Sequence, residues 1–180
     1  ALVFALSIAA LAADTVEYGS SELGLSFSAP ADFKIVSRDS YETDPVVDEL
    51  PYTMENLDRW FTGDGDFYFT GISKISRCSF ILRAYPGGHE YFLSHIESWE
   101  LDSLMDYMAN AFAEDGAELL STETYPHPET TFLRYGYIIT DDDGSRHYKL
   151  SFYTAYGENT IRTDFWFLDE NSTPEQNALA

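Results

Sequence analysis

Apolar and polar side chains alternate most clearly in the second half of this 180-residue chain. A two-residue period is typical of strands with one buried face, and four segments carry it. They span about residues 119–125, 131–140, 146–156 and 160–168. The separators Asp141–Gly144 and Gly157–Asn159 are rich in residues that favour tight turns. Because tight turns connect antiparallel neighbours, we expect a four-stranded antiparallel meander.

A helical period precedes this meander. Apolar residues recur at intervals of three or four, as one face of a helix requires: Leu101, Leu104, Met105, Met108 and Phe112. Asp102 is a suitable N-cap, and Gly116 stands where a left-handed residue would end the helix. A second helix is expected to begin at Thr173, where a capping box coincides with a proline at the first helical position. Few residues follow, so we expect this C-terminal helix to be truncated.

The N-terminal half carries weaker signals. Leu25 and Phe27 alternate with small polar residues, and Phe33 and Ile35 continue the period after Pro30, which predicts two short strands. We expect them to form a hairpin-like pair that meets at a proline corner. A buried strand is also expected over residues 77–85, before the turn residues at 86–88.

Residues 39–76 lack a clean period, and we interpret them as a partly ordered insertion. Within this segment, residues 54–61 could form a short helix. The glycines and aspartates at 63–66 then predict a turn into an apolar run that begins at Phe67.

The first thirteen residues form an uncharged apolar run that stops at Asp14. Such a run matches the h-region of a secretory signal and is shorter than the roughly 20 residues that a membrane-spanning helix needs. Ala10 and Ala12 also place small residues where a signal peptidase reads. We therefore interpret residues 1–13 as the remnant of an export signal. The mature protein would be extracytoplasmic, either secreted or associated with the cell envelope.

Together these elements predict one domain over residues 14–180, of the α+β class. Its architecture would be an αβα sandwich with a central, mostly antiparallel sheet and helices packed on it. The chain is long enough to bury one hydrophobic core, and 29 of its residues are aromatic. Its single cysteine, Cys78, excludes an internal disulfide and is expected to be a small buried side chain.

Pairing the predicted strands yields a candidate ligand face. If Asp141–Gly144 is a four-residue loop, then Leu133, Tyr135 and Tyr137 lie opposite Phe152, Leu150 and Tyr148, and apolar faces match. The other face then combines basic, acidic and aromatic side chains: Arg134, Lys149, Tyr153, Arg162, Asp164 and Trp166. Such a face could recognise an anionic or carbohydrate ligand. Alternatively, it is an exposed sheet face where arginine pairs with Asp164 and Lys149 rests on Trp166.

Charge narrows the range of partners. The chain carries 31 acidic and 10 basic residues, for a formal net charge of −21. This charge disfavours nucleic acid and anionic membrane surfaces, and it is typical of a soluble monomer. A protein with a basic patch, or diffuse binding of divalent cations, remains compatible with it.

The sequence contains none of the common signatures of catalysis. His89, His95, His127 and His147 lack the spacing of metal ligands. Asp141 begins a run similar to a calcium loop, but its twelfth position is Phe152 instead of glutamate, so we expect a hairpin turn. Nucleophile-elbow, phosphate-loop and dinucleotide motifs do not occur. We assign no catalytic, metal-binding or cofactor-binding residue and expect a protein that is not an enzyme and has no cofactor.

Several short segments together resemble a known family. These are the strand that begins Leu25-Ser26-Phe27-Ser28, a later strand that ends in Pro86-Gly87, the helix from Leu101 to Met108, and its end at Glu114–Glu118. Over residues 22–38 and 78–180 the chain resembles the PsbP-like superfamily, notably its small exported bacterial members related to DcrB. The resemblance implies an αβα sandwich and a non-catalytic role. Relatives in that superfamily include extrinsic subunits docked on photosystem II and Ran-binding Mog proteins. The segment 39–76 departs from the compact pattern, and no site residue is carried over.

The functional hypothesis is an exported, non-enzymatic protein that binds a protein or a cell-envelope component. The alternative is a binding module for a small anionic or carbohydrate ligand on the candidate face. A hydrolase would need a cleft that gathers residues far apart in the sequence.

Overall fold

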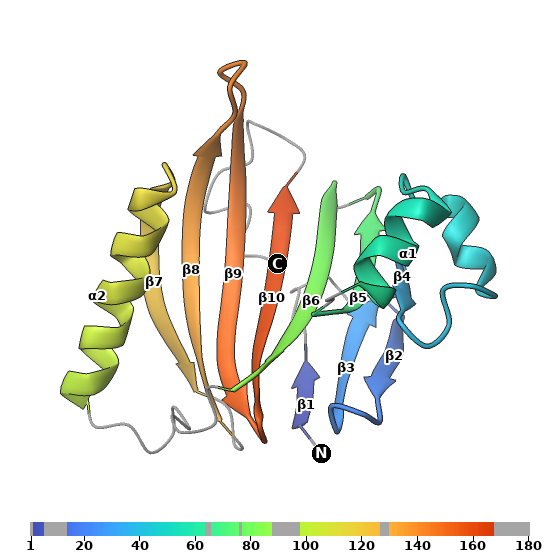
Figure 1. Ribbon diagram of the computed structural model, residues 1–180, viewed down its shortest axis with the longest axis horizontal. Coiled ribbons are helices and arrows are strands. Elements are labelled where there is room, and N and C mark those ends of the chain that lie inside the picture. Colours follow the sequence, from blue (N-terminus) through green and yellow to red (C-terminus); the bar gives the residue numbers. More distant parts are fainter. Residues whose placement is uncertain are drawn as a thin grey trace. The chain divides into compact units, whose positions relative to one another are not determined.

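The computed structural model of the protein (Figure 1) describes residues 2–5, 14–63, 66–75, 77–87, 98–126 and 130–167. The chain divides into two compact units, one of residues 1–84 with 172–180 and the other of residues 85–171. The α+β class expected from the sequence is confirmed, because each unit combines antiparallel strands with an α-helix packed on them.

The first unit contains the antiparallel strands β4 (Phe33–Ser37), β5 (Phe67–Ser73) and β6 (Cys78–Pro86), in the order β4-β5-β6. The strand expected over residues 77–85 is thus confirmed. Strands β4 and β5 approach closely at Gly71, where a Cβ atom would lie 2.5 Å from the backbone oxygen of Lys34. Only glycine fits this crossing without a shift of the backbone.

A second sheet of this unit has the order β1-β3-β2, formed by β1 (Leu2–Ala5), β2 (Thr15–Ser20) and β3 (Leu25–Pro30). Strand β2 pairs antiparallel with β3, and β1 pairs parallel with β3. The strands expected around Leu25 and Phe33 are confirmed, but their hairpin-like pairing is wrong. The turn at residues 21–24 leads β3 back along β2 instead, while β4 pairs with β5. The identity of residues 1–13 as a signal remnant stays a prediction.

The short helix expected at residues 54–61 is confirmed as α1 (Met54–Thr62), and a 3-10 helix, η1 (Pro45–Glu49), precedes it. The side chain of Thr53 accepts from the Asn56 backbone N–H, and Asn56 accepts from the Thr53 backbone N–H, which completes a capping box. Helix α1 buries Leu57 and Phe61 in an apolar cluster with Val36, Tyr41, Leu50 and Ile72. Residues 39–76 therefore supply a helix and the strand between β4 and β6.

The second unit contains the expected meander, in the order β10-β9-β8-β7. Its strands are β7 (Glu118–Pro126), β8 (Thr131–Thr140), β9 (Arg146–Tyr156) and β10 (Asn159–Phe167). Figure 1 shows α2 (Ser98–Glu114) beside β7. Helix α2 begins before Asp102, so Asp102 is not its N-cap. Its end is as expected, because Gly116 has φ of +79° and the Ala117 N–H donates to the Phe112 carbonyl.

The register of β8 and β9 differs from the expectation by one residue. Residues 141 and 145 close a three-residue loop, in which Asp141 N–H donates to the Ser145 carbonyl and Gly144 adopts φ of +85°. Thr140 therefore lies opposite Arg146, and Leu133 lies opposite Tyr153 instead of Phe152. Strands β9 and β10 pair through a two-residue loop at residues 157 and 158, which places Phe165 opposite Leu150.

Among the described residues, no helix is both long enough and apolar enough to cross a membrane. Residues 88–97, the turn at 127–129 and the helix expected after Thr173 lie outside the described part of the chain.

Candidate functional site

Five of the six residues predicted for the ligand face lie on one face of β9 and β10. Opposite residues of an antiparallel pair point to the same side of a sheet. The register pairs Lys149 with Trp166, Ser151 with Asp164, and Tyr153 with Arg162. We call these six residues the β9–β10 face.

Arg134, the sixth predicted residue, does not belong to this face. It lies opposite Phe152 on β9 and opposite Glu123 on β7. Its Nη1 atom is 2.7 Å from Oε2 of Glu123, in a salt bridge. The one-residue change in register moves Arg134 to the other side of the sheet, because side chains alternate along a strand.

A buried carboxylate organises the β9–β10 face. Asp164 is 2% exposed and accepts hydrogen bonds from the Ser151 hydroxyl and from Arg162 Nε, the latter at 2.8 Å. The hydroxyls of Ser151 and Tyr137 are 3.0 Å apart, so the network extends onto β8. The charged groups thus satisfy one another, as buried charges require.

The two cations of this face also lie against aromatic rings. Lys149 Nζ is 3.0 Å from the centroid of the Trp166 ring, and Arg162 Cζ is 5.1 Å from that of Tyr153. Lys149 is only 6% exposed, whereas Trp166 is 39% exposed. This arrangement matches the alternative in which Lys149 rests on Trp166 and an arginine pairs with Asp164.

The protonation states on this face follow from burial and from Asp164. Burial is the largest single influence on Arg162 and lowers its pKa, but the charge and hydrogen bond of Asp164 together with the nearby Tyr153 and Tyr137 outweigh burial, so the net pKa is raised. Burial raises the pKa of Tyr153 and of Tyr137, and Asp164 raises both further. At neutral pH the arginine is charged and both phenols are neutral. Neutral phenols are poor general bases, so these side chains are better suited to holding β9 and β10 together than to proton transfer.

An aromatic cluster lies between α2 and the sheet. Tyr135 is fully buried, with its ring centroid 5.3 Å from that of Phe112 and 5.9 Å from that of Tyr153. Burial raises the pKa of Tyr135. Its hydroxyl has no hydrogen-bond partner among the described residues.

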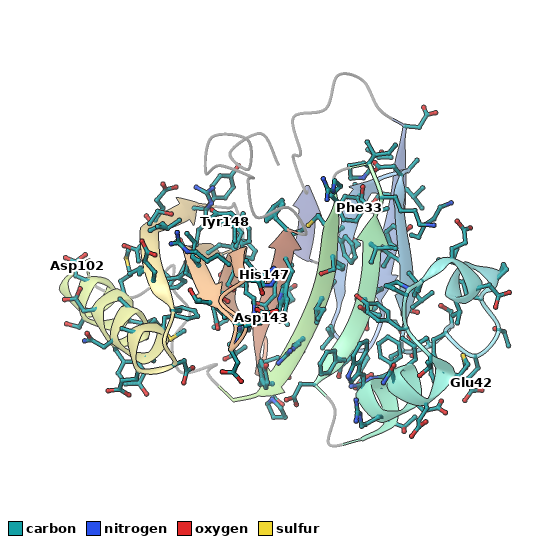
Figure 2. All side chains as sticks on the ribbon, turned by 90° about the horizontal axis from the view of Figure 1, so that it is seen from above. Phe33, Glu42, Asp102, Asp143, His147 and Tyr148 are labelled. Carbon is teal, nitrogen blue, oxygen red and sulfur yellow. The ribbon has the colours of Figure 1, made fainter. Side chains whose placement is uncertain are left out.

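The acidic loop between β8 and β9 is a hairpin turn. Figure 2 shows Asp143 and His147 at this hairpin. Asp143 accepts hydrogen bonds from the Ser145 hydroxyl and backbone N–H, which lower the pKa of Asp143. His147 Nε2 lies 2.9 Å from an oxygen of Asp141. Across the described residues, no three or more His, Cys, Asp or Glu side chains are placed to hold a metal ion.

Sequence reasoning missed a second surface, on α2 and β7. Tyr107, Leu120 and Tyr125 are 68%, 40% and 56% exposed. Residues 98–126 include seven acidic residues and no lysine or arginine. Figure 2 shows one of these acids, Asp102, on the side of α2 that faces away from the strands. We call the exposed part of this segment the α2–β7 surface. The absence of any Lys or Arg between Arg83 and Arg134 is a sequence signal that could have identified it.

Comparison with known proteins identifies the fold. Neither the models of known protein families nor the curated proteins include a match to this chain. Among solved structures, the chain is similar to the solution structure of cyanobacterial PsbP (CyanoP) from Synechocystis sp. PCC 6803. The TM-score is 0.53 with 13% sequence identity, over 93% of this chain and 88% of that one. The protein therefore has a PsbP-like fold.

Proposed function

We propose that this protein is an exported, non-enzymatic protein that binds a protein or a cell-envelope component. The PsbP-like fold is compatible with this role. The proposal depends mainly on one observation, which is the contrast between the two surfaces of the second unit. The polar groups of the β9–β10 face engage one another, whereas the α2–β7 surface exposes aromatic and acidic side chains to solvent.

The geometry gives less support to a small anionic or carbohydrate ligand. Lys149 and Asp164 are almost fully buried, so a ligand would have to displace their present partners. Arg134 lies on the opposite side of the sheet, where it pairs with Glu123. A thermal-shift screen with sugars and phosphates distinguishes the two functions. We expect no stabilisation, and a reproducible rise in melting temperature would favour the small-ligand alternative.

Export is the second part of the proposal, and it depends on the apolar run at residues 1–13. Intact mass spectrometry of the protein purified from its source cells would test it. We expect the mature chain to begin close to Asp14 and to be found outside the cytoplasm. A cytoplasmic protein that retains residues 1–13 would contradict export without affecting the binding role.

Affinity capture followed by binary measurements would test the binding role. Tagged protein would be cross-linked in intact cells, and each recurring partner would be purified and titrated against the untagged protein by calorimetry. We expect one recurring partner that forms a saturable complex in isolation. If no recovered protein or envelope fraction bound in isolation, the proposed function would be wrong.

A further inference from the structure

We infer that the outer edge of β7 accepts an extended, basic segment of a partner protein as an additional strand. This inference rests on the proposed protein-binding function and specifies its site and the chemistry of its partner. Adding a strand to an exposed sheet edge is a common mode of peptide recognition, in which main-chain hydrogen bonds supply affinity and side-chain contacts supply specificity.

The position of β7 provides the template. Strand β7 is the last of the order β10-β9-β8-β7, and within the described residues β8 is its only strand partner. It is nine residues long, and most of its residues are exposed or half-exposed even though α2 packs against it, so its outer edge offers a row of backbone N–H and C=O groups. Edge strands are commonly protected by lysine side chains, and β7 contains none.

Two exposed side chains on β7 could contact an added strand. Leu120 is 40% exposed and lies where the β7–β8 register shifts, between Leu119 and Ser121, so no β8 residue is its direct partner. Tyr125 is 56% exposed near the end of the strand. Tyrosine is a frequent anchor in interfaces, and an exposed leucine adds apolar area that a partner can bury. Pro126 ends the strand and limits the length of the added segment.

The charge of this region selects a basic occupant. With seven acids and no base in residues 98–126, an incoming segment rich in Lys or Arg is attracted and an acidic one is repelled. The same argument disfavours a second copy of this chain, since two such edges would bring acidic surfaces together. Glu118 and Glu123 are exposed residues of β7 itself, although Glu118 also pairs with Arg146 on β9 and Glu123 with Arg134 on β8.

Synthetic peptides and the full chain would test the inference. The first probe is a nine-residue peptide of alternating valine and lysine, which matches the length of β7. A second peptide has the same sequence but is N-methylated at alternate amides, which removes hydrogen-bond donors and keeps the charge. A third replaces lysine with glutamate. We expect the first peptide to bind at least about fivefold more tightly than either control and to protect β7 amides from hydrogen exchange.

Matched variants distinguish strand addition from general attraction of positive charge. Leu120→Lys and Tyr125→Lys add one positive charge on β7, and Tyr107→Lys adds the same charge on α2. All three side chains are exposed, so we expect the fold to be retained. The two β7 variants should lower the affinity for the first peptide at least about fivefold, whereas Tyr107→Lys should lower it less than about twofold.

Several outcomes would overturn the inference. Equal affinity for the N-methylated peptide, or equal losses in all three variants, would show electrostatic adsorption alone. Concentration-dependent dimers that Leu120→Lys dissolves would make a second copy the occupant. If an established partner bound wild type and Leu120→Lys equally, the β7 site would be wrong while the protein-binding function remained.

Discussion

The apolar cluster under α1 is made of apolar side chains, whereas the polar network of the β9–β10 face is made of paired charges. Under α1, apolar side chains are buried against one another, and the hydroxyl of the buried Tyr41 donates to Asp58 at 3.0 Å. On the β9–β10 face, the buried carboxylate of Asp164 and the buried Lys149 contact their partners together with the partly exposed Arg162. We expect the apolar cluster to keep most of its stability when one apolar side chain replaces another of similar volume. We expect the polar network to lose stability when one of its charged members is removed. Four predictions test this contrast, in order of decreasing effect.

Leu57→Ala should cause the largest loss, because Leu57 is fully buried under α1 and the substitution leaves a cavity. We expect a decrease of about 3–4 kcal/mol in the free energy of unfolding. Chemical denaturation would measure the total, and hydrogen exchange with mass spectrometry would localise the loss to the first unit. Leu57→Met is the volume-matched control and should cost less than about 1.5 kcal/mol. Similar losses in both variants would show that shape complementarity does not dominate here.

Asp164→Ala should destabilise the second unit by about 3 kcal/mol, because Arg162 would remain without its anion. This value lies at the low end for buried pairs, since the Arg162 side chain is 25% exposed and partly screened by solvent. The control is the double variant Arg162→Met/Asp164→Leu, which removes both charges and should be close to wild type. A double variant as unstable as Asp164→Ala would mean that the polar network contributes net stability beyond neutralising its own buried charges.

Gly71→Ala and Gly136→Ala extend the comparison to the backbone. At Gly71 the added methyl would meet the backbone oxygen of Lys34 at 2.5 Å, and at Gly136 it would meet the hydroxyls of Tyr148 and Ser121 at 2.7 and 2.8 Å. Hydroxyl groups at the ends of side chains can move, and a paired backbone cannot. We expect a loss of about 2 kcal/mol for Gly71→Ala and less than about 1 kcal/mol for Gly136→Ala in thermal unfolding. The reverse order would show that β4 and β5 can separate locally.

The smallest effect concerns pH and the β8–β9 loop. Hydrogen bonds from Ser145 hold the folded-state pKa of Asp143 below its ordinary value of 3.8. Their contribution to stability is therefore present above the unfolded-state pKa and is lost as the pH falls through the folded-state pKa. In an NMR titration we expect Ser145→Ala to raise the pKa of Asp143, with no change in stability at neutral pH beyond the lost hydrogen bonds. An unchanged titration would mean that the Ser145 hydroxyl does not lower the pKa of Asp143.

Elements that bury only one face could be predicted from the sequence. The meander follows from strand periods and α2 from a helical period, and both are confirmed. Strand β5 was not recognised because six of its seven residues are buried, so its sequence has no alternation to reveal it. Periodicity likewise could not locate the start of α2, which extends before Asp102.

The composition of the candidate face depended on one loop. An Asp-Asp-Asp-Gly-Ser sequence can close a hairpin with three or four loop residues, and apolar matching favoured the longer one. The observed loop uses three, which keeps Lys149, Tyr153, Arg162, Asp164 and Trp166 together and separates Arg134 from them. A register error of one residue exchanges the two faces of a strand. A face predicted across a hairpin is therefore correct only if the length of the loop is predicted correctly.

The absence of lysine and arginine between Arg83 and Arg134 also has a practical consequence. Trypsin cuts after these two residue types, so it cannot cleave within α2 or β7 and would release both in one fragment from Ala84 to Arg134. Amine-reactive cross-linkers would find no lysine there either. A glutamate-specific protease and carboxylate-reactive cross-linkers are the reagents that can report on this part of the molecule.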